Sequence, residues 1–168
     1  MPPTYPNHTF YPKAKQWLLP NHSAPGTLAQ RKLIILHVTA GPTAASALYT
    51  FQKSIAPHRV SAHFVIDRDG TVYQTVPLEE TTWHASAANE HSVGIEHAAI
   101  PNTLPPTEVQ YTASAALVKW LCETLHIPCD RKHVLTHHEA SPADGHVGCC
   151  APTLDPDQVV SMASRGGM

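Results

Sequence analysis

The sequence predicts a single α/β domain, and three observations support that prediction. The chain has 168 residues, a length that fits one domain and can bury roughly 70% of the surface that the unfolded chain exposes. From residue 32 onward, short apolar runs alternate with longer segments of helical composition. No internal repeat and no linker interrupts this alternation. We therefore expect one folded unit, residues 32–168, preceded by residues 1–31.

The first 31 residues predict an extended arm that wraps the domain. They are rich in proline, asparagine and histidine and show no hydrophobic period. They contain no charged start followed by an apolar run, so the sequence predicts no Sec signal peptide. No segment of the chain approaches the ~18–20 apolar residues of a membrane span. We therefore expect either that an export signal was trimmed or that the protein leaves the cell another way, and we expect no membrane-spanning segment.

The first strand is expected at residues 32–38, a short apolar run typical of a buried central strand. The run ends at residues 39–42, a turn whose proline suits the first turn of a helix. Residues 43–55 have a helical composition, and Pro57 stops that helix. This order places the end of a buried strand directly before a helix.

A β-hairpin is expected next. Residues 61–67 alternate as a strand, Asp69-Gly70 supplies the positive-φ positions of a tight turn, and residues 71–76 form the return strand. Two further short strands are predicted at residues 92–97 and 133–136. The chain therefore has enough strands for a central sheet.

A long helix is expected from Pro105 to about His126, with Thr107 as its N-cap. Its apolar residues recur at helical spacing, so one face should pack inward. These residues are Ala113, Ala116, Leu117, Trp120, Leu121 and Leu125. From Glu139 onward we expect a loop, followed by a last helix from Pro156.

Composition narrows the functional classes. The net charge is −2 with histidine neutral, and the basic residues form no stripe, which argues against nucleic acid as a partner. The chain holds 13 histidines, and histidine is the commonest metal ligand. Cys149 and Cys150 are adjacent, which is not the pattern of a disulfide scaffold. A single bridge between Cys122 and Cys129 fits the sequence, and so do four free thiols of which one binds a metal.

Two polar residues stand at places where burial would be costly. His37 lies at the carboxyl end of an apolar strand, the edge at which α/β sheets build their sites. The alternative is a buried histidine satisfied by the backbone. Glu96 lies in the apolar run 92–97, and its alternative is a rim residue that faces water. Near a metal it would be a suitable general base.

A second histidine segment completes the pattern. The histidine pair His137-His138 follows the predicted strand 133–136, and the thiols of Cys149 and Cys150 lie about a dozen residues further on. Two histidines and one thiolate or carboxylate make a three-ligand zinc site, which leaves a fourth position for water and is typical of catalytic zinc. The alternative is one structural histidine and two unrelated cysteines.

Five segments in order resemble one known family. They are LIILHVTAG from Leu33, SAHFVIDRDGTVYQTVP from Ser61, the tripeptide WHA at Trp83, SVGIEH from Ser92 and THHEASP from Thr136. Together they resemble the zinc-dependent N-acetylmuramoyl-L-alanine amidases, which share their fold with peptidoglycan recognition proteins. The resemblance runs from about residue 33 to residue 156. It implies a central mixed β-sheet flanked by helices, with residues 32–168 as the catalytic domain.

The resemblance implies a Zn²⁺ ion held by three residues. His37 matches the first ligand, and His137 matches the second because it lies five residues before a proline. Cys149 best fits the third ligand. The loop before it is two residues longer than the family pattern, so Cys150 and Asp144 remain alternatives.

The resemblance also implies two catalytic residues. Glu96 would take a proton from the attacking water, as in the glutamate branch of the family, because Ala62 stands where the phage branch has a tyrosine. The family lysine that stabilises the transition state is absent, and Val147 falls at its position. His146 is the nearest polar replacement.

Three residues are expected beside the substrate. Trp83 and His84 match the family motif that lines the cleft, and His63 lies in the first hairpin strand. We expect all three to contact or support the substrate. For His63 the alternative is a strand histidine bonded to the backbone.

The implied reaction is hydrolysis of the amide between N-acetylmuramic acid and L-alanine, with peptidoglycan or muropeptides as partner. A non-catalytic peptidoglycan binder and a zinc amidase for another amide are the alternatives. Action on the wall without a Sec leader would suit a phage lysin, an effector injected into rival cells or a cytoplasmic recycling enzyme. An injected effector would also imply an immunity protein as partner.

Overall fold

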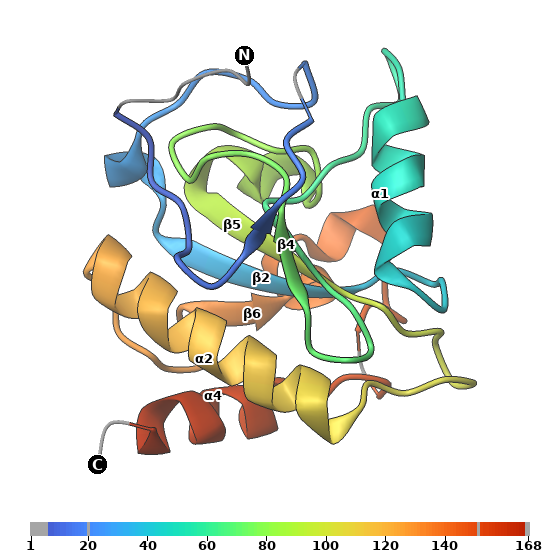
Figure 1. Cartoon of the computed structure of the whole chain (residues 1–168), viewed down its shortest axis with the longest axis vertical. Helices are drawn as coiled ribbons and strands as arrows, with labels where there is room; N and C mark the ends of the chain where they lie inside the picture. The colour runs from blue at the N-terminus through green and yellow to red at the C-terminus, as the bar shows by residue number, and fades with distance from the viewer. Residues whose placement is uncertain (1–6, 20, 151, 167–168) are drawn as a thin grey trace.

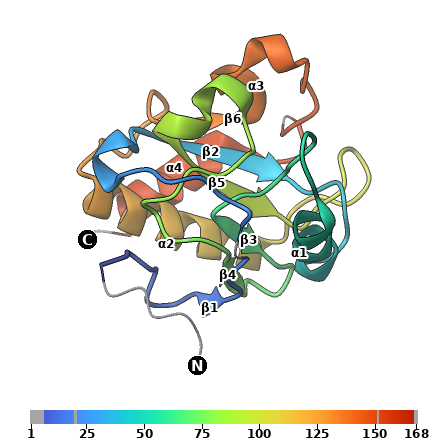
Figure 2. The same ribbon diagram turned by 90° about the horizontal axis from the view of Figure 1, so that it is seen from above.

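The computed structural model describes residues 7–19, 21–150 and 152–166. Its centre is a six-stranded sheet with the strand order β1-β4-β3-β5-β2-β6. Figure 2 shows α2 (Glu108–Leu125) at the left of this sheet, α1 (Ala44–Lys53) at the right and the short α3 (His137–Ala140) at the top. The expected α/β domain with a helix-flanked sheet is therefore confirmed.

The sheet is mixed, as expected. Its strand β2 (Leu33–Val38), the last but one in the order, runs parallel to β5 (Ser92–His97) on one side and to the edge strand β6 (Val134–Thr136) on the other. On the far side of β5, β3 (Phe64–Ile66) is parallel to β5 and antiparallel to β4 (Val72–Gln74). The β3–β4 pair is the hairpin that Asp-Gly predicts, although both strands are shorter than the sequence suggested.

The arm contributes a strand that we did not expect. Within the described part of residues 1–31, β1 (Lys15–Gln16) pairs in parallel with β4 at the edge of the sheet. Tyr11 and Leu19 on either side of it are buried. Figure 1 shows this dark blue segment beside β4. This part of the arm is therefore integrated into the sheet and the core.

Three helices surround the sheet. They are α1 (Ala44–Lys53), α2 (Glu108–Leu125) and α4 (Pro156–Arg165). The Thr107 side chain accepts a hydrogen bond from the Gln110 backbone N–H, so the expected N-cap of α2 is confirmed. On α2, however, Ala116 is exposed and Ala115 is buried instead. The other five residues of the expected apolar stripe are buried or pack against the core, so the inward face is confirmed except at Ala116.

Short helices occupy segments that the sequence left as loops. The α3 helix (His137–Ala140) begins directly after β6, and three 3-10 helices span Leu28–Gln30, Ser86–His91 and Pro142–Asp144. The side chain of Glu139 accepts a hydrogen bond from the Thr136 backbone N–H at the start of α3. This reciprocal cap explains why a helix starts where we expected a loop.

Alternation along the strands divides the sheet into two faces. Ile34 and Leu36 of β2 join the main core, which also holds residues of α2 and α4. Ile35 belongs to a separate small cluster with Ala85 of the WHA segment and Ala88. The face of β2 that carries Ile35 and His37 therefore lies opposite the main core. Among the described helices, none is long and apolar enough to cross a membrane.

Candidate active site

The site forms where the parallel strands end. His37 near the end of β2 is paired in register with Glu96 of β5. His137 is the first residue of α3, directly after β6, and Cys149 lies in the loop between the short helix Pro142–Asp144 and α4. Because parallel strands end at the same edge, three separate segments bring their side chains together there.

Three of these side chains could hold one metal ion. The ligand atoms of His37, His137 and Cys149 all lie within 4.8 Å of one another. The Cys149 sulfur is 3.6 Å from Nδ1 of His37. In a tetrahedral site with Zn–N near 2.0 Å and Zn–S near 2.3 Å, nitrogen and sulfur lie about 3.5 Å apart. These residues therefore fit a zinc ion.

Each histidine uses its other ring nitrogen to contact a neighbouring side chain. Nε2 of His137 lies 3.0 Å from a carboxylate oxygen of Asp144. Nε2 of His37 lies 2.9 Å from Nδ1 of His84. Outer contacts of this kind fix the ring orientation of metal-binding histidines. Both rings are thus left with Nδ1 as the atom that can bind the metal.

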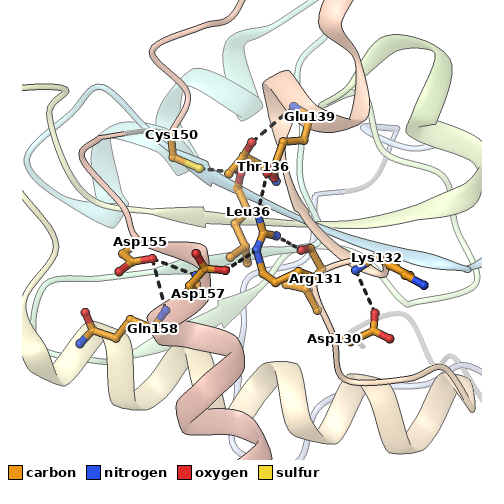
Figure 3. A network of polar contacts seen from close by, with 11 residues as sticks. Leu36, Asp130, Arg131, Lys132, Thr136, Glu139, Cys150, Asp155, Asp157 and Gln158 are labelled. Carbon is orange, nitrogen blue, oxygen red and sulfur yellow. Dashed lines mark hydrogen bonds and ion pairs between the residues drawn. The ribbon is translucent and has the colours of Figure 1, made fainter.

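The structure separates the three candidates for the third ligand. The Cys150 thiol is buried and bonded to the Leu36 carbonyl oxygen at 3.0 Å, as Figure 3 shows. It does not line the cavity, whereas Cys149 does. Asp144 contacts the back of the His137 ring. The geometry therefore favours Cys149, and all four cysteines of the chain are free thiols.

The surroundings of Cys149 favour the thiolate form of its side chain. The neighbouring Cys150 thiol is the largest cause that lowers the pKa of Cys149, and contacts with His137 and His37 lower it further. The closeness of Cys149 and burial raise the pKa of Cys150. The charge of this thiol pair therefore resides on Cys149, and thiolate is the form that binds zinc.

Glu96 is a partly buried residue that lines the cavity. Burial raises its pKa to about 7, and this effect outweighs the opposing influence of His37. Its Oε2 atom is buried and has no hydrogen-bond partner among the described residues. An unsatisfied carboxylate oxygen with a pKa near neutrality is what a general base for water requires.

The ligand candidates and Glu96 share one cavity of about 670 Å³. Trp83 and His84 line it, as expected. The Arg59 guanidinium lies 5.1 Å from the centre of the Trp83 ring. Arg59 also lines the cavity, and it is the only lysine or arginine among the lining residues described. The cavity therefore combines the polar ligand candidates and Glu96 with a positive charge from Arg59 and an aromatic ring from Trp83.

His146 lies beside the metal candidates. Its ring stacks on that of His137 with centroids 4.4 Å apart and an interplanar angle of 13°. It lines the cavity, and so does Val147, which is exposed. A ring N–H at this place can reach the cavity, as the missing family lysine would.

The structure gives His63 a supporting position instead of a substrate contact. Its ring is completely buried and does not line the cavity. Nε2 lies 2.8 Å from the Glu80 carbonyl oxygen, while Nδ1 accepts a hydrogen bond from the Gly94 N–H and lies 3.1 Å from the Thr82 hydroxyl. Of the readings left open for His63, the strand histidine bonded inside the protein fits the structure, because both ring nitrogens have partners there.

A polar network holds the start of α3 in place. Arg131 contacts Glu139 at 2.6 Å and Asp157 of α4 at 2.9 Å, and it also bonds the Val134 carbonyl oxygen of β6. Figure 3 shows these groups converging on the guanidinium. Because Glu139 also caps α3 at Thr136, Arg131 links the helix that carries His137 to the rest of the fold.

Sequence reasoning missed Arg59 and the supporting part of Asp144. Arg59 stands two residues before the hairpin segment that resembles the family, and its position carried no periodic signal. Asp144 was weighed only as a ligand. An acidic residue seven positions after a ligand histidine could have signalled an outer contact, because metal-binding histidines commonly donate to carboxylates.

The comparisons with known proteins point to one family. The family of N-acetylmuramoyl-L-alanine amidases matches residues 28–158. The 1,6-anhydro-N-acetylmuramyl-L-alanine amidase AmpD of Escherichia coli (strain K12) is 34% identical over 102 residues, which are 56% of this chain and 54% of that protein. N-acetylmuramoyl-L-alanine amidase A of Achromobacter lyticus is 35% identical over 104 residues, with 60% and 56% covered. The chain thus spans about half the length of these relatives.

The fold agrees with that match. A crystal structure of an AmpD derivative has a TM-score of 0.71 and 24% identity to this chain, over 91% of this chain and 96% of that one. The family match covers most of the sequence, including every residue of the metal candidate group. This chain belongs to the N-acetylmuramoyl-L-alanine amidase family.

Proposed function

We propose that this protein is a zinc-dependent hydrolase of the amide bond between N-acetylmuramic acid and L-alanine in peptidoglycan or its fragments. One observation supports the proposal above all others. A three-ligand group suited to zinc shares a cavity with a carboxylate whose buried oxygen has no partner among the described residues. Three ligands leave a fourth position, and the carboxylate provides the base that amide hydrolysis needs.

In this proposal His37, His137 and Cys149 hold Zn²⁺. When bound, the ion would polarise the scissile carbonyl and make water more acidic. Glu96 accepts the proton of the attacking water and returns it to the leaving L-alanine nitrogen. In the metal-free protein burial raises the pKa of Glu96 to about 7, so this carboxylate can take up a proton near neutral pH.

His146 takes the place of the family lysine in this proposal. Its ring is fixed by stacking on His137 and faces the cavity. There it donates a hydrogen bond to the carbonyl oxygen as negative charge develops. Loss of one such donor costs roughly 100- to 1000-fold in comparable chemistry, so His146 should matter for kcat.

The cavity wall supports a peptide-bearing sugar as substrate. Trp83 offers an aromatic face, and Arg59 offers a permanent positive charge. A stem peptide carries free carboxylates, and arginine pairs well with carboxylates. The relatives named above are amidases of this substrate class. The substrate would therefore lie in the cell wall or among its soluble fragments.

The test is digestion of purified peptidoglycan and of muropeptides, followed by mass spectrometry. Protein loaded with zinc, chelated protein and the Glu96→Gln variant would be compared. Stem peptides that begin with free L-alanine, released only by the zinc-loaded wild type, would support the proposal. Bound but intact wall would favour a non-catalytic binder, and neither binding nor cleavage would point to a different amide.

A further inference from the structure

A chain of hydrogen bonds leads away from the metal candidate His37 into the protein. Nε2 of His37 lies 2.9 Å from Nδ1 of His84. Nε2 of His84 lies 3.2 Å from the Ser92 hydroxyl oxygen. That hydroxyl donates to the Ala88 carbonyl oxygen at 2.7 Å. Two ring nitrogens and one hydroxyl thus connect the site to a backbone carbonyl.

The end of the chain determines where each proton lies. A carbonyl oxygen only accepts, so the single O–H of Ser92 is committed to Ala88. The Ser92 oxygen can then only accept, and Nε2 of His84 must carry the proton between them. A neutral imidazole has one N–H. Nδ1 of His84 is therefore an acceptor, which requires a proton on Nε2 of His37.

We propose that His84 and Ser92 are positioning residues that fix the neutral tautomer of His37. In that tautomer Nε2 of His37 carries the proton and Nδ1 keeps its lone pair. Nδ1 is the nitrogen that lies 3.6 Å from the Cys149 sulfur, on the side of the metal group. This inference rests on the zinc site of the proposed function. It gives His84 a defined supporting role, where the sequence left substrate contact and support both open.

Gly94 leaves room for the His84 ring at the position from which it contacts Ser92. A Cβ atom on Gly94 would lie 2.7 Å from both Cγ and Nδ1 of the His84 ring. The absence of a side chain on this strand residue therefore lets the ring approach β5 closely enough to reach Ser92. A glycine inside a buried strand is otherwise unfavourable. Gly94→Ala should displace the ring without removing any hydrogen-bonding side chain.

The protein contains a second histidine–serine pair that offers a matched control. His97 bonds the His37 carbonyl oxygen through Nδ1 at 2.9 Å, and its Nε2 lies 2.9 Å from the Ser114 hydroxyl. Ser92 and Ser114 are both completely buried. The two pairs differ in one respect, because the Ser114 pair reaches only the backbone of His37. Ser114→Ala therefore removes a buried serine hydroxyl but leaves the side-chain contacts of the His37 ring unchanged.

The first readout is the tautomer itself, in metal-free protein. Long-range ¹H–¹⁵N correlation spectra of ¹⁵N-histidine-labelled protein distinguish protonated from unprotonated ring nitrogens. In the wild type we expect a proton on Nε2 of both His37 and His84. In His84→Phe, Ser92→Ala and Gly94→Ala we expect His37 to be a mixture of its two neutral tautomers. In Ser114→Ala we expect His37 to keep the tautomer of the wild type. A His37 ring protonated on Nδ1 in the wild type would overturn the proposal, and no variant is needed to see it.

The second readout is zinc affinity, measured by competition with a chromophoric chelator. Loss of an outer partner typically weakens metal binding 10- to 100-fold. We expect that loss for His84→Phe and a smaller loss for Ser92→Ala, with Ser114→Ala within twofold of the wild type. Equal affinities for Ser92→Ala and the wild type, together with an unchanged His37 tautomer, would refute the proposal.

The two proposals can fail separately. If the wild type shows the expected tautomer and binds zinc but cleaves no muropeptide, the proposed function fails and the positioning role stands. If it cleaves muropeptides while His37 is protonated on Nδ1 without metal, the positioning role fails and the proposed function stands.

Discussion

Replacement of Glu96 by glutamine tests the general base most sharply. Glutamine keeps the size of the side chain but cannot accept a proton at neutral pH. General base catalysis typically contributes 100- to 10,000-fold to the rate, which corresponds to about 3–5 kcal/mol of transition-state stabilisation. We expect Glu96→Gln to lower kcat for muropeptide hydrolysis within that range. Zinc content should stay near that of the wild type, because Glu96 is not in the metal candidate group.

The same change should stabilise the metal-free fold. Burial raises the pKa of Glu96 from 4.5 to about 7, so the folded state binds this proton more tightly than the unfolded state does. Stability therefore falls as pH rises from about 4.5 to 7, by at most about 3 kcal/mol. Glutamine carries no charge and removes this loss. At pH 8 we expect metal-free Glu96→Gln to exceed the wild type in unfolding free energy, and the difference to vanish near pH 4.5.

Two assays test the catalytic role of Glu96 and its effect on stability. Product release from a defined muropeptide gives kcat, and urea unfolding of metal-free protein at pH 4.5 and 8 gives the stability difference. A variant that retains wild-type kcat would remove Glu96 from the mechanism. A variant less stable than the wild type at pH 8 would show that the carboxylate makes a favourable interaction in the folded state, which contradicts its unpartnered oxygen.

Three further predictions follow from the site and its surroundings. Cys149→Ala should lose bound zinc and Cys150→Ala should keep it, because only the first thiol lies in the cavity; metal analysis after gel filtration checks this, and the reverse pattern contradicts the ligand assignment. His63 has a folded-state pKa near 3 because burial lowers it from 6.5, so acidification below pH 6.5 should destabilise the fold by up to about 1.4 kcal/mol per pH unit through this residue. His63→Gln should make that slope shallower in urea titrations between pH 6.5 and 4.5, and an equal slope would contradict the buried neutral ring. Arg59→Ala should raise KM about tenfold or more with little change in kcat, since it contacts Trp83 on the wall and not the metal candidates; a loss confined to kcat would place Arg59 in the chemistry instead.

The sequence predicted elements whose signals are local. The strand 92–97 was expected at the bounds that β5 has, and the α2 cap at Thr107 is a short-range pattern of side chain and backbone. β1 had no such signal, because Lys15 and Gln16 are exposed and form a strand only by pairing with distant β4. Strand propensity and hydrophobic periodicity depend only on residues that are close in the sequence. An edge strand of two residues forms instead because it pairs with a strand that is distant in the sequence.

The metal candidates were expected from strand ends, from spacing and from the family resemblance, whereas their supporting groups were not expected. His37, His137 and Cys149 are separated by long stretches of sequence, yet the parallel order of β2, β5 and β6 brings the ends of their segments together. A one-dimensional pattern does not show which way a ring turns. It therefore could not place His63 behind the cavity, nor reveal that a serine in β5 lies beside His84.

The central claim is hydrolysis at one bond by water activated in this cavity. Digestion of a defined muropeptide in H₂¹⁸O, with zinc and with chelator, tests it in one measurement by mass spectrometry. Our account predicts one ¹⁸O atom in the lactyl carboxylate of the sugar product and an unlabelled stem peptide with a free L-alanine amine, only when zinc is present. Label in a peptide carboxylate, or equal cleavage in chelator, would contradict it.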